Sequence, residues 1–106
     1  MSSSSNEKNS QLDTDCIKIY YSFFKLGLKA NELILFSLLY QECEQNAVCK
    51  KGLNYLSKRI NATKHTVLRC LSILIDKNLI IKKQGIDNKP SEYRINYESM
   101  DKYINQ

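Results

Sequence analysis

A run of basic side chains without an acidic neighbour is the part of this sequence best suited to binding chemistry. Between Gln45 and Ile75 there is no Asp or Glu. A surface that carried the cations of this run could pair with phosphates and release their counterions. For a charge run alone, the simpler interpretation is a solvated basic surface without a ligand. The cations in the run are Lys50, Lys51, Lys58, Arg59, Lys64 and Arg69.

Two helices joined by a tight turn would position most of these cations. Leu53, Leu56 and Ile60 recur at i, i+3 and i+7, which predicts a first helix with one apolar face. Asn61 is expected to end this helix, because asparagine tolerates the left-handed backbone conformation. Thr63 can then cap a second, longer helix through its hydroxyl. The buried stripe of the second helix is predicted to consist of Val67, Cys70, Leu71 and Leu74.

The opposite face of the second helix is polar and basic. It carries His65, Arg69 and Ser72, and Lys64 and Thr66 flank it near the first turn. A helix that enters a DNA major groove needs such a surface. Arg69 is expected to read a base, because a guanidinium can pair bidentately with guanine. Together with the acid-free charge run, this spacing favours double-stranded DNA binding over a solvated surface.

A β-hairpin is predicted after the second helix, which Asn78 is expected to end. Residues 79–84 and 91–96 form its arms, and residues 85–90 form its turn. We expect Leu79 and Ile81 on one face, and Ile80 and Lys82 on the other. The hairpin is crowded with cations and is the second expected DNA contact. The complete set of expected DNA-binding residues is Lys50, Lys51, Lys58, Arg59, Thr63, Lys64, His65, Thr66, Arg69, Lys82, Lys83, Lys89 and Arg94.

The elements outside this region complete a single domain. Residues 1–14 are Ser- and Asn-rich and are expected to be a disordered tail, and residues 15–106 form the domain. Apolar and polar residues alternate over residues 17–24, which predicts a strand that Gly27 ends. Residues 29–43 predict a helix that is apolar nearly all round and therefore buried. A short helix is expected from Ser99, with Met100 on its apolar face.

Composition limits the other classes of function. The chain has 106 residues, a net charge of +5 and no apolar run long enough to span a membrane. Its beginning lacks the hydrophobic core of a signal peptide, so a cytoplasmic location is expected. Its four cysteines form no Cys-x-x-Cys pair, and with a single histidine they predict no metal site. We find no phosphate loop, nucleophile pair or paired carboxylates, so neither enzymatic activity nor a cofactor is expected.

The order of strand, buried helix, helix–turn–helix and hairpin resembles a winged helix-turn-helix domain. LGLKANELILFSLLY and GLNYLSKRINATKHTVLRCLSILIDKNLIIKK look like winged-helix segments of bacterial plasmid and phage proteins. Those proteins include replication initiators, replisome organisers, origin-of-transfer accessory proteins and small regulators. The resemblance covers residues 17–97 and implies an α+β fold, with a three-helix core, a small antiparallel sheet and a β-hairpin wing.

By the pattern of this family, Ser57 lets the two helices approach, and Leu68 lies among residues that commonly contact DNA. Leu68, Ile73 and Ile75 stand where polar or charged residues are usual. The implied function is sequence-specific binding of double-stranded DNA by a protein of a bacterial mobile element. Such a protein occupies an origin of replication or transfer, or an operator, and recruits the replication, transfer or transcription machinery. The alternative is a winged-helix module for protein–protein assembly that does not bind DNA.

A homodimer is also expected, because a lone winged helix covers only a few base pairs. Several apolar residues are not obviously needed in the core of one small domain. The alternative is that the last helix folds back over the first strand and covers Tyr20 and Phe24. The expected dimer interface consists of Ile73, Ile75, Met100, Tyr103 and Ile104.

Overall fold

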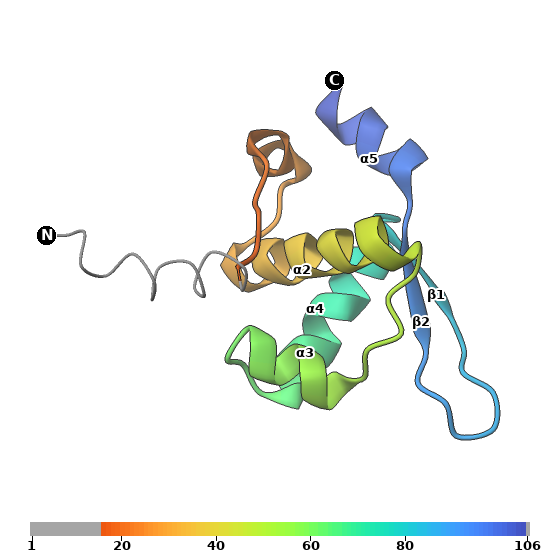
Figure 1. Ribbon diagram of the computed structural model, residues 1–106. Coiled ribbons are helices and arrows are strands. Elements are labelled where there is room, and N and C mark those ends of the chain that lie inside the picture. Colours follow the sequence, from red (N-terminus) through yellow and green to blue (C-terminus); the bar gives the residue numbers. More distant parts are fainter. Residues whose placement is uncertain (1–15, 106) are drawn as a thin grey trace, which may run out of the picture.

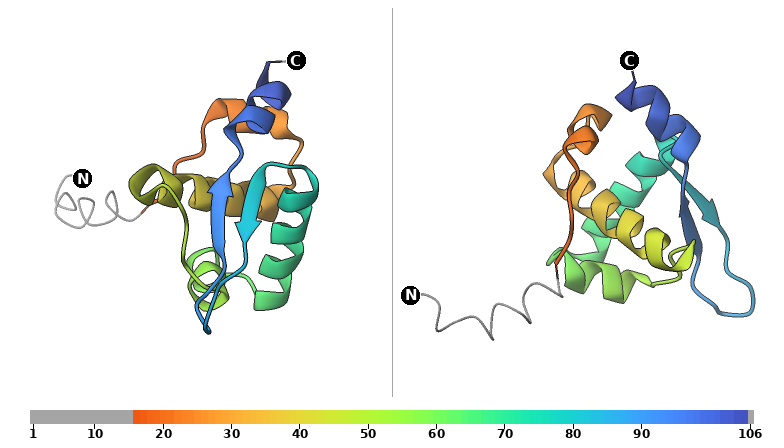
Figure 2. Two further views of the ribbon diagram at one scale, coloured as in Figure 1. Left: turned by 90° about the vertical axis from the view of Figure 1, so that its right-hand side faces the viewer. Right: turned by 45° about the horizontal axis from the view of Figure 1, so that its top comes forward.

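The computed structural model describes residues 16–105, so the tail expected over residues 1–14 lies outside the described part. Helix α2 crosses the middle of the molecule (Figure 1). At one end lie α3, the start of α4 and the tip of the hairpin, and at the other lie η2 and α5 (Figures 1 and 2). The elements are the 3-10 helix η2 (Tyr21–Leu26), α2 (Ala30–Asn46), α3 (Leu53–Arg59), α4 (Lys64–Asp76), β1 (Ile80–Lys83), β2 (Glu92–Ile95) and α5 (Tyr97–Ile104).

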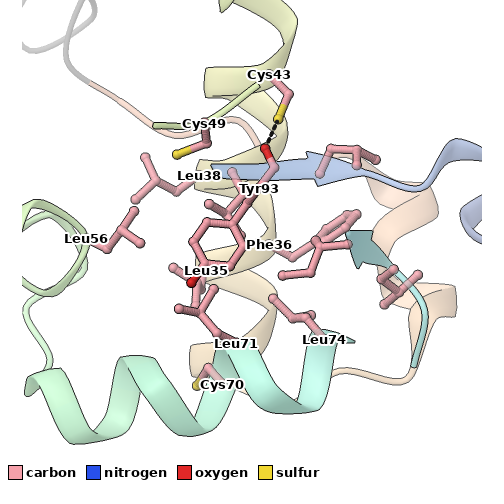
Figure 3. Packing of buried hydrophobic residues seen from close by; sticks show 14 of the residues in the cluster. Leu35, Phe36, Leu38, Cys43, Cys49, Leu56, Cys70, Leu71, Leu74 and Tyr93 are labelled. Carbon is pink, nitrogen blue, oxygen red and sulfur yellow. Dashed lines mark hydrogen bonds between the residues drawn. The ribbon is translucent and has the colours of Figure 1, made fainter. Parts of the chain in front are cut away.

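Helix α2 is the centre of the core, as its apolar sequence predicted. Phe36 and Leu39 are fully buried, and Leu38 is nearly so. Figure 3 shows side chains of α2 meeting those of α3, α4 and β2 in one continuous cluster. The helix begins where the backbone N–H of Lys29 donates to Glu32 Oε1 at 3.0 Å. This bond makes the glutamate half of a capping box, although Lys29 cannot supply the other half.

The two asparagines predicted to end helices do so with the same geometry. Asn61 has φ 55° and Asn78 has φ 61°, both in the left-handed region. After α3, the N–H of Ala62 bonds to Ser57 O at 2.9 Å. After α4, the N–H of Leu79 bonds to Leu74 O at 3.0 Å. Both turns are Schellman motifs, in which orphan carbonyls of the last helical turn gain partners.

The strand predicted over residues 17–24 is wrong, because this segment is extended only as far as Tyr20 and then forms η2. A 3-10 helix has three residues per turn, so residues three apart share a face. Phe23 and Leu26 are buried on one such face, and Gly27 ends the helix with φ 71°. The sequence contains both a period of two and a period of three here, and packing of Phe23 and Leu26 selects the second.

The predicted hairpin is confirmed, with β1 and β2 antiparallel and Lys82 opposite Tyr93. Within the strand the predicted facing is confirmed, because Ile80 is buried and Lys82 is on the same face, whereas Ile81 on the other face is 50% exposed. Leu79 is also buried, because it belongs to the Schellman motif that stops α4 and the alternation starts one residue later. An isolated antiparallel bridge also joins Cys49, in the connector before α3, to Tyr93 of β2.

Helix α5 begins at Tyr97, two residues earlier than predicted, because Asn96 caps it by accepting from the N–H of Ser99 at 3.3 Å. It lies beside η2, and Lys25 Nζ donates to Ile104 O at 3.4 Å. It does not cover Phe24, which is 64% exposed. The last helix therefore folds back beside this segment, as the alternative expected, but it leaves Phe24 uncovered and Tyr20 41% exposed.

Candidate nucleic-acid interface

The solvent face of α4 carries the side chains predicted to meet DNA. Its cations gather in the first half of the helix, and Asp76 lies at the far end. The free N–H groups of the first turn add a partial positive charge at the cationic end. An anion approaching this helix is therefore attracted to its N-terminal half. The exposed residues of the face are Lys64, His65, Leu68, Arg69, Ser72 and Asp76.

The cap of α4 fixes two of the predicted contact residues. The N–H of Thr66 donates to Thr63 Oγ1 at 3.1 Å, and the Thr63 hydroxyl donates to Thr66 Oγ1 at 3.0 Å. These bonds hold the first turn in place. Thr63 and Thr66 are thus part of the frame that presents Lys64 and His65.

Two of the cations before and within α3 lie over an aromatic ring. Lys50, Lys51, Lys58 and Arg59 are all exposed, and Lys51 Nζ and Arg59 Cζ also lie 5.0 Å and 5.9 Å from the centroid of the Tyr55 ring. The Tyr55 hydroxyl donates to Glu42 Oε2 at 3.1 Å. Burial and the bond to Glu42 raise the pKa of this phenol, so it stays protonated as a donor. The sequence pattern gave no sign of Tyr55, which holds two predicted DNA contacts against α3.

The strand register places the hairpin cations on opposite faces. Lys82 is opposite Tyr93 and shares the inner face with buried Ile80. Lys83 is opposite Glu92 and lies on the outer face, as does Arg94. Only Lys82 of these three cations therefore points toward the helices. The expected set of DNA contacts included cations of both faces.

A hollow of 280 Å³ separates the hairpin from the helices. Leu53, Leu56 and Leu68 line its helical side, and Tyr93 lies on its sheet side. Lys51, Lys82 and Lys89 surround these apolar groups. No described element covers Leu68, which is 50% exposed. The hollow thus joins α3, α4 and the wing into one concave surface with cations around it.

The wing tip is built by a tight turn. Asp87 and Asn88 have φ 54° and 65°, and the N–H of Lys89 bonds to Ile86 O at 3.2 Å. A side chain at Gly85 would meet Lys89 O at 1.9 Å, so only glycine fits there. The tip is therefore held compactly, and Lys89 is presented at the edge of the hollow.

The residues expected at a dimer interface are buried or partly buried in a single copy of the chain. Met100 is buried in the core of its own chain. Ile75 and Ile104 are partly buried against that core, and the Tyr103 hydroxyl donates to Lys77 O at 3.2 Å. Ile73 is partly buried on α4. Burial of Met100 contradicts its assignment to an interface, because α5 needs this side chain to pack on the domain.

The cysteines occupy structural positions. Cys43, Cys49 and Cys70 are buried, and Cys43 Sγ donates to Tyr93 O at 3.5 Å (Figure 3). Burial raises the pKa of the Cys49 thiol to about 11 and also raises the pKa of Cys43 and Cys70. Within residues 16–105, no group of His, Cys, Asp and Glu is arranged to hold a metal ion. The same residues contain no helix long and apolar enough to cross a membrane.

Comparison with solved structures identifies the architecture. An N-terminal domain of a DNA-binding protein matches with a TM-score of 0.63 and 17% identity, over 82% of this chain and 78% of that one. A Rep protein in a Rep–DNA complex matches with a TM-score of 0.64 and 17% identity over the same shares. The chain has a winged-helix fold. This result confirms the α+β class that the sequence predicted.

A third structure is more distant. It is a possible transcriptional regulator from Methanosarcina mazei Go1, with a TM-score of 0.57 and 16% identity over 86% of this chain and 87% of that one. No protein-family model and no curated protein sequence matches this chain. The winged helix is therefore established by three-dimensional similarity, while the biological process has to be argued from the surface.

Proposed function

We propose that this protein binds double-stranded DNA sequence-specifically through the concave surface formed by α4, α3 and the wing. The observation that carries the proposal is that the cationic half of α4 and the inner face of the wing lie at the same end of the molecule (Figure 2). Lys64 and Arg69 would then lie in a major groove, while Lys82 and Lys89 follow the adjacent backbone. Two of the similar structures are of proteins described as DNA-binding or DNA-bound, which supports this use of the fold.

The proposed role is occupation of a DNA site followed by recruitment of other proteins. It involves no catalytic step and no cofactor, and it places the protein in the cytoplasm, where DNA is accessible. The resemblance to plasmid and phage proteins supports an origin of replication or transfer, or an operator, as the site. Selection of bound sequences from a random duplex pool tests the proposal of specificity directly, because a non-specific binder would enrich no common motif.

The test of the interface is the dependence of duplex affinity on salt. The variant Lys64→Gln with Arg69→Gln removes two cations from the exposed face of α4. If both side chains contact phosphate, the slope of log affinity against log salt should fall by about two. If Arg69 reads a base instead, the slope should fall by about one, and binding of the selected sequence should weaken more than binding of a random duplex. Fluorescence anisotropy with a labelled duplex measures both quantities.

The control removes the same charge at the other end of the molecule. Lys25→Gln with Lys102→Gln changes two cations on η2 and α5, far from the wing tip (Figure 1). Binding to a duplex with a single site should keep the slope of the unchanged protein. Equal effects of the two variants would show that only total charge matters and would contradict the proposed interface.

Exposed apolar residues favour the second candidate function, a module for protein assembly. Leu68 and Ile81 are each 50% exposed, and Ile86 at the wing tip is 67% exposed. An assembly surface would use these side chains and tolerate loss of the cations. Absence of any salt-dependent duplex binding would favour this candidate over the first.

A further inference from the structure

The outward face of η2 is an unusually exposed aromatic surface. Tyr21 is 92% exposed and Phe24 is 64% exposed. These residues are three apart, and in a 3-10 helix such residues stand on the same face. Their opposite face supplies Phe23 and Leu26 to the core. Two adjacent rings facing water lose the free energy that burial would provide, so a covering partner would stabilise this surface.

A second aromatic surface lies beside η2, between it and α5. The Tyr40 ring of α2 has its centroid 5.7 Å from that of Tyr20 and 6.0 Å from that of Tyr97, both in edge-on contact. Tyr20 is 41% exposed and Tyr97 is 48% exposed. We call these three rings the Tyr40 patch. Aromatic rings favour such edge and offset contacts with further rings, so the patch suits an aromatic partner.

The two surfaces carry opposite charges at their margins. Lys18 and Lys25 are exposed near the η2 rings, and residues 16–28 contain no acid. Burial is the main cause that raises the pKa of Tyr40, and the nearby charges of Glu44 and Asp101 raise it further. Glu44 stands one helical turn after Tyr40 on α2, and Asp101 stands one turn after Tyr97 on α5, so each shares a helix face with a ring of the patch, and both are exposed. The η2 rings thus have a basic margin, while the patch has an acidic one.

We propose that a second copy of this chain covers both surfaces in a two-fold dimer. The rings Tyr21 and Phe24 of each copy would pack on the Tyr40 patch of the other, which places basic margins beside acidic ones. Such an isologous contact uses both complementary surfaces twice. Each aromatic ring can bury about 150–250 Å², so these partly exposed rings would supply on the order of half of the roughly 800 Å² per partner in a standard interface.

The structure and sequence favour a second copy over other occupants. Residues 1–15, which lie outside the described part, contain Met1 and Leu12 as their only large apolar side chains, too few to cover two aromatic surfaces. The proposed interface also lies at the end opposite the wing tip, so both candidate DNA surfaces would stay accessible (Figure 1). A dimer with two such surfaces would read a longer DNA site, and this consequence rests on the proposed function. Self-association itself does not depend on DNA binding.

Sedimentation velocity without DNA, over a series of protein concentrations, tests the dimer. The variant Tyr21→Ser with Phe24→Ser changes exposed side chains and should keep the thermal unfolding midpoint of the unchanged protein at concentrations where both are monomeric. Its dimer dissociation constant should rise at least about tenfold, because central aromatic anchors carry most of the energy of an interface. The matched control, Ile81→Ser with Ile86→Ser, removes two exposed apolar side chains elsewhere and should dimerise normally.

Charge reversal tests how the two copies are arranged. Lys18→Glu and Asp101→Lys should each weaken the dimer, and the variant carrying both changes should regain much of the lost affinity. A monomer at every concentration, or undiminished association of the Tyr21 and Phe24 variant, overturns the proposal. If the variant with both charge changes associates more weakly than either single variant, the pairing of η2 with the Tyr40 patch is overturned. Binding of a single-site duplex by the monomeric variant keeps a failure of the dimer distinct from a failure of DNA binding.

Discussion

The end formed by α3, the first half of α4 and the wing carries most of the exposed cations of the described residues. The end formed by η2 and α5 carries their exposed aromatic side chains, Tyr20, Tyr21, Phe24 and Tyr97. Helix α4 turns its apolar stripe inward and leaves polar groups outside, as an amphipathic helix does. In η2, by contrast, aromatic residues occupy both the inner and the outer face. Exposed cations are well hydrated, whereas exposed rings are not, so the second end is the one that calls for a covering partner.

The largest effect should come from the core that both ends share. Phe36→Ala removes a fully buried ring of α2 that contacts Phe23, with ring centroids 5.1 Å apart. The free energy of unfolding should fall by about 3–5 kcal/mol. Chemical denaturation measures this loss. A variant destabilised at only one end would show that η2 and the winged helix are less tightly connected than their shared core indicates.

Arg69→Ala should change the DNA binding of one end and leave the self-association of the other end unchanged. Loss of one base-reading guanidinium should weaken binding of the selected DNA site by about 1–3 kcal/mol, with relaxed preference at one base pair. Self-association should stay unchanged, because Arg69 is on α4 and away from η2. Titration of matched and mismatched duplexes measures the first effect. Equal weakening on every duplex would indicate that Arg69 contacts only phosphate.

The smallest expected effect distinguishes the two faces of the wing. Lys82→Ala removes a cation from the inner face, whereas Lys83→Ala removes its neighbour from the outer face opposite Glu92. DNA affinity should fall more for Lys82, with the salt slope reduced by about one only in that variant. The two proteins have the same net charge, so each is the control for the other. Equal slopes would show that the wing meets DNA by its tip rather than by its inner face.

Much of the fold follows from local sequence signals, and its exceptions have physical causes. Asn61, Thr63 and Asn78 marked the ends of helices because their side chains and backbone preferences act within a few residues. The predicted alternation in the wing failed only at Leu79, because this residue belongs to the stop of α4, which a period-two pattern cannot reveal. The segment that became η2 was ambiguous until Phe23 had α2 to pack against. Local signals thus predict elements, whereas facing depends on contacts distant in sequence.

The candidate site was also predicted only in part, because local signals identify charged residues and not the groups that they contact. The charge run identified the cations, and helical spacing placed His65 and Arg69 on an exposed face. The sequence could not show that Lys51 and Arg59 lie over Tyr55, or which face of the hairpin points toward the helices. The helical spacing also assigned Met100 to the expected dimer interface, whereas the core of its own chain takes up this side chain.

The bridge between Cys49 and Tyr93 has a mechanical consequence. The N–H of each residue bonds to the carbonyl of the other, at 2.8 Å and 2.9 Å, so the connector before α3 is fastened to the base of the wing. A force that moves β2 would therefore pass to the connector through these two hydrogen bonds. The connector and the hairpin base would then shift together, and α3 with them. A duplex that displaces the wing would thereby also adjust the height of α3 above the groove.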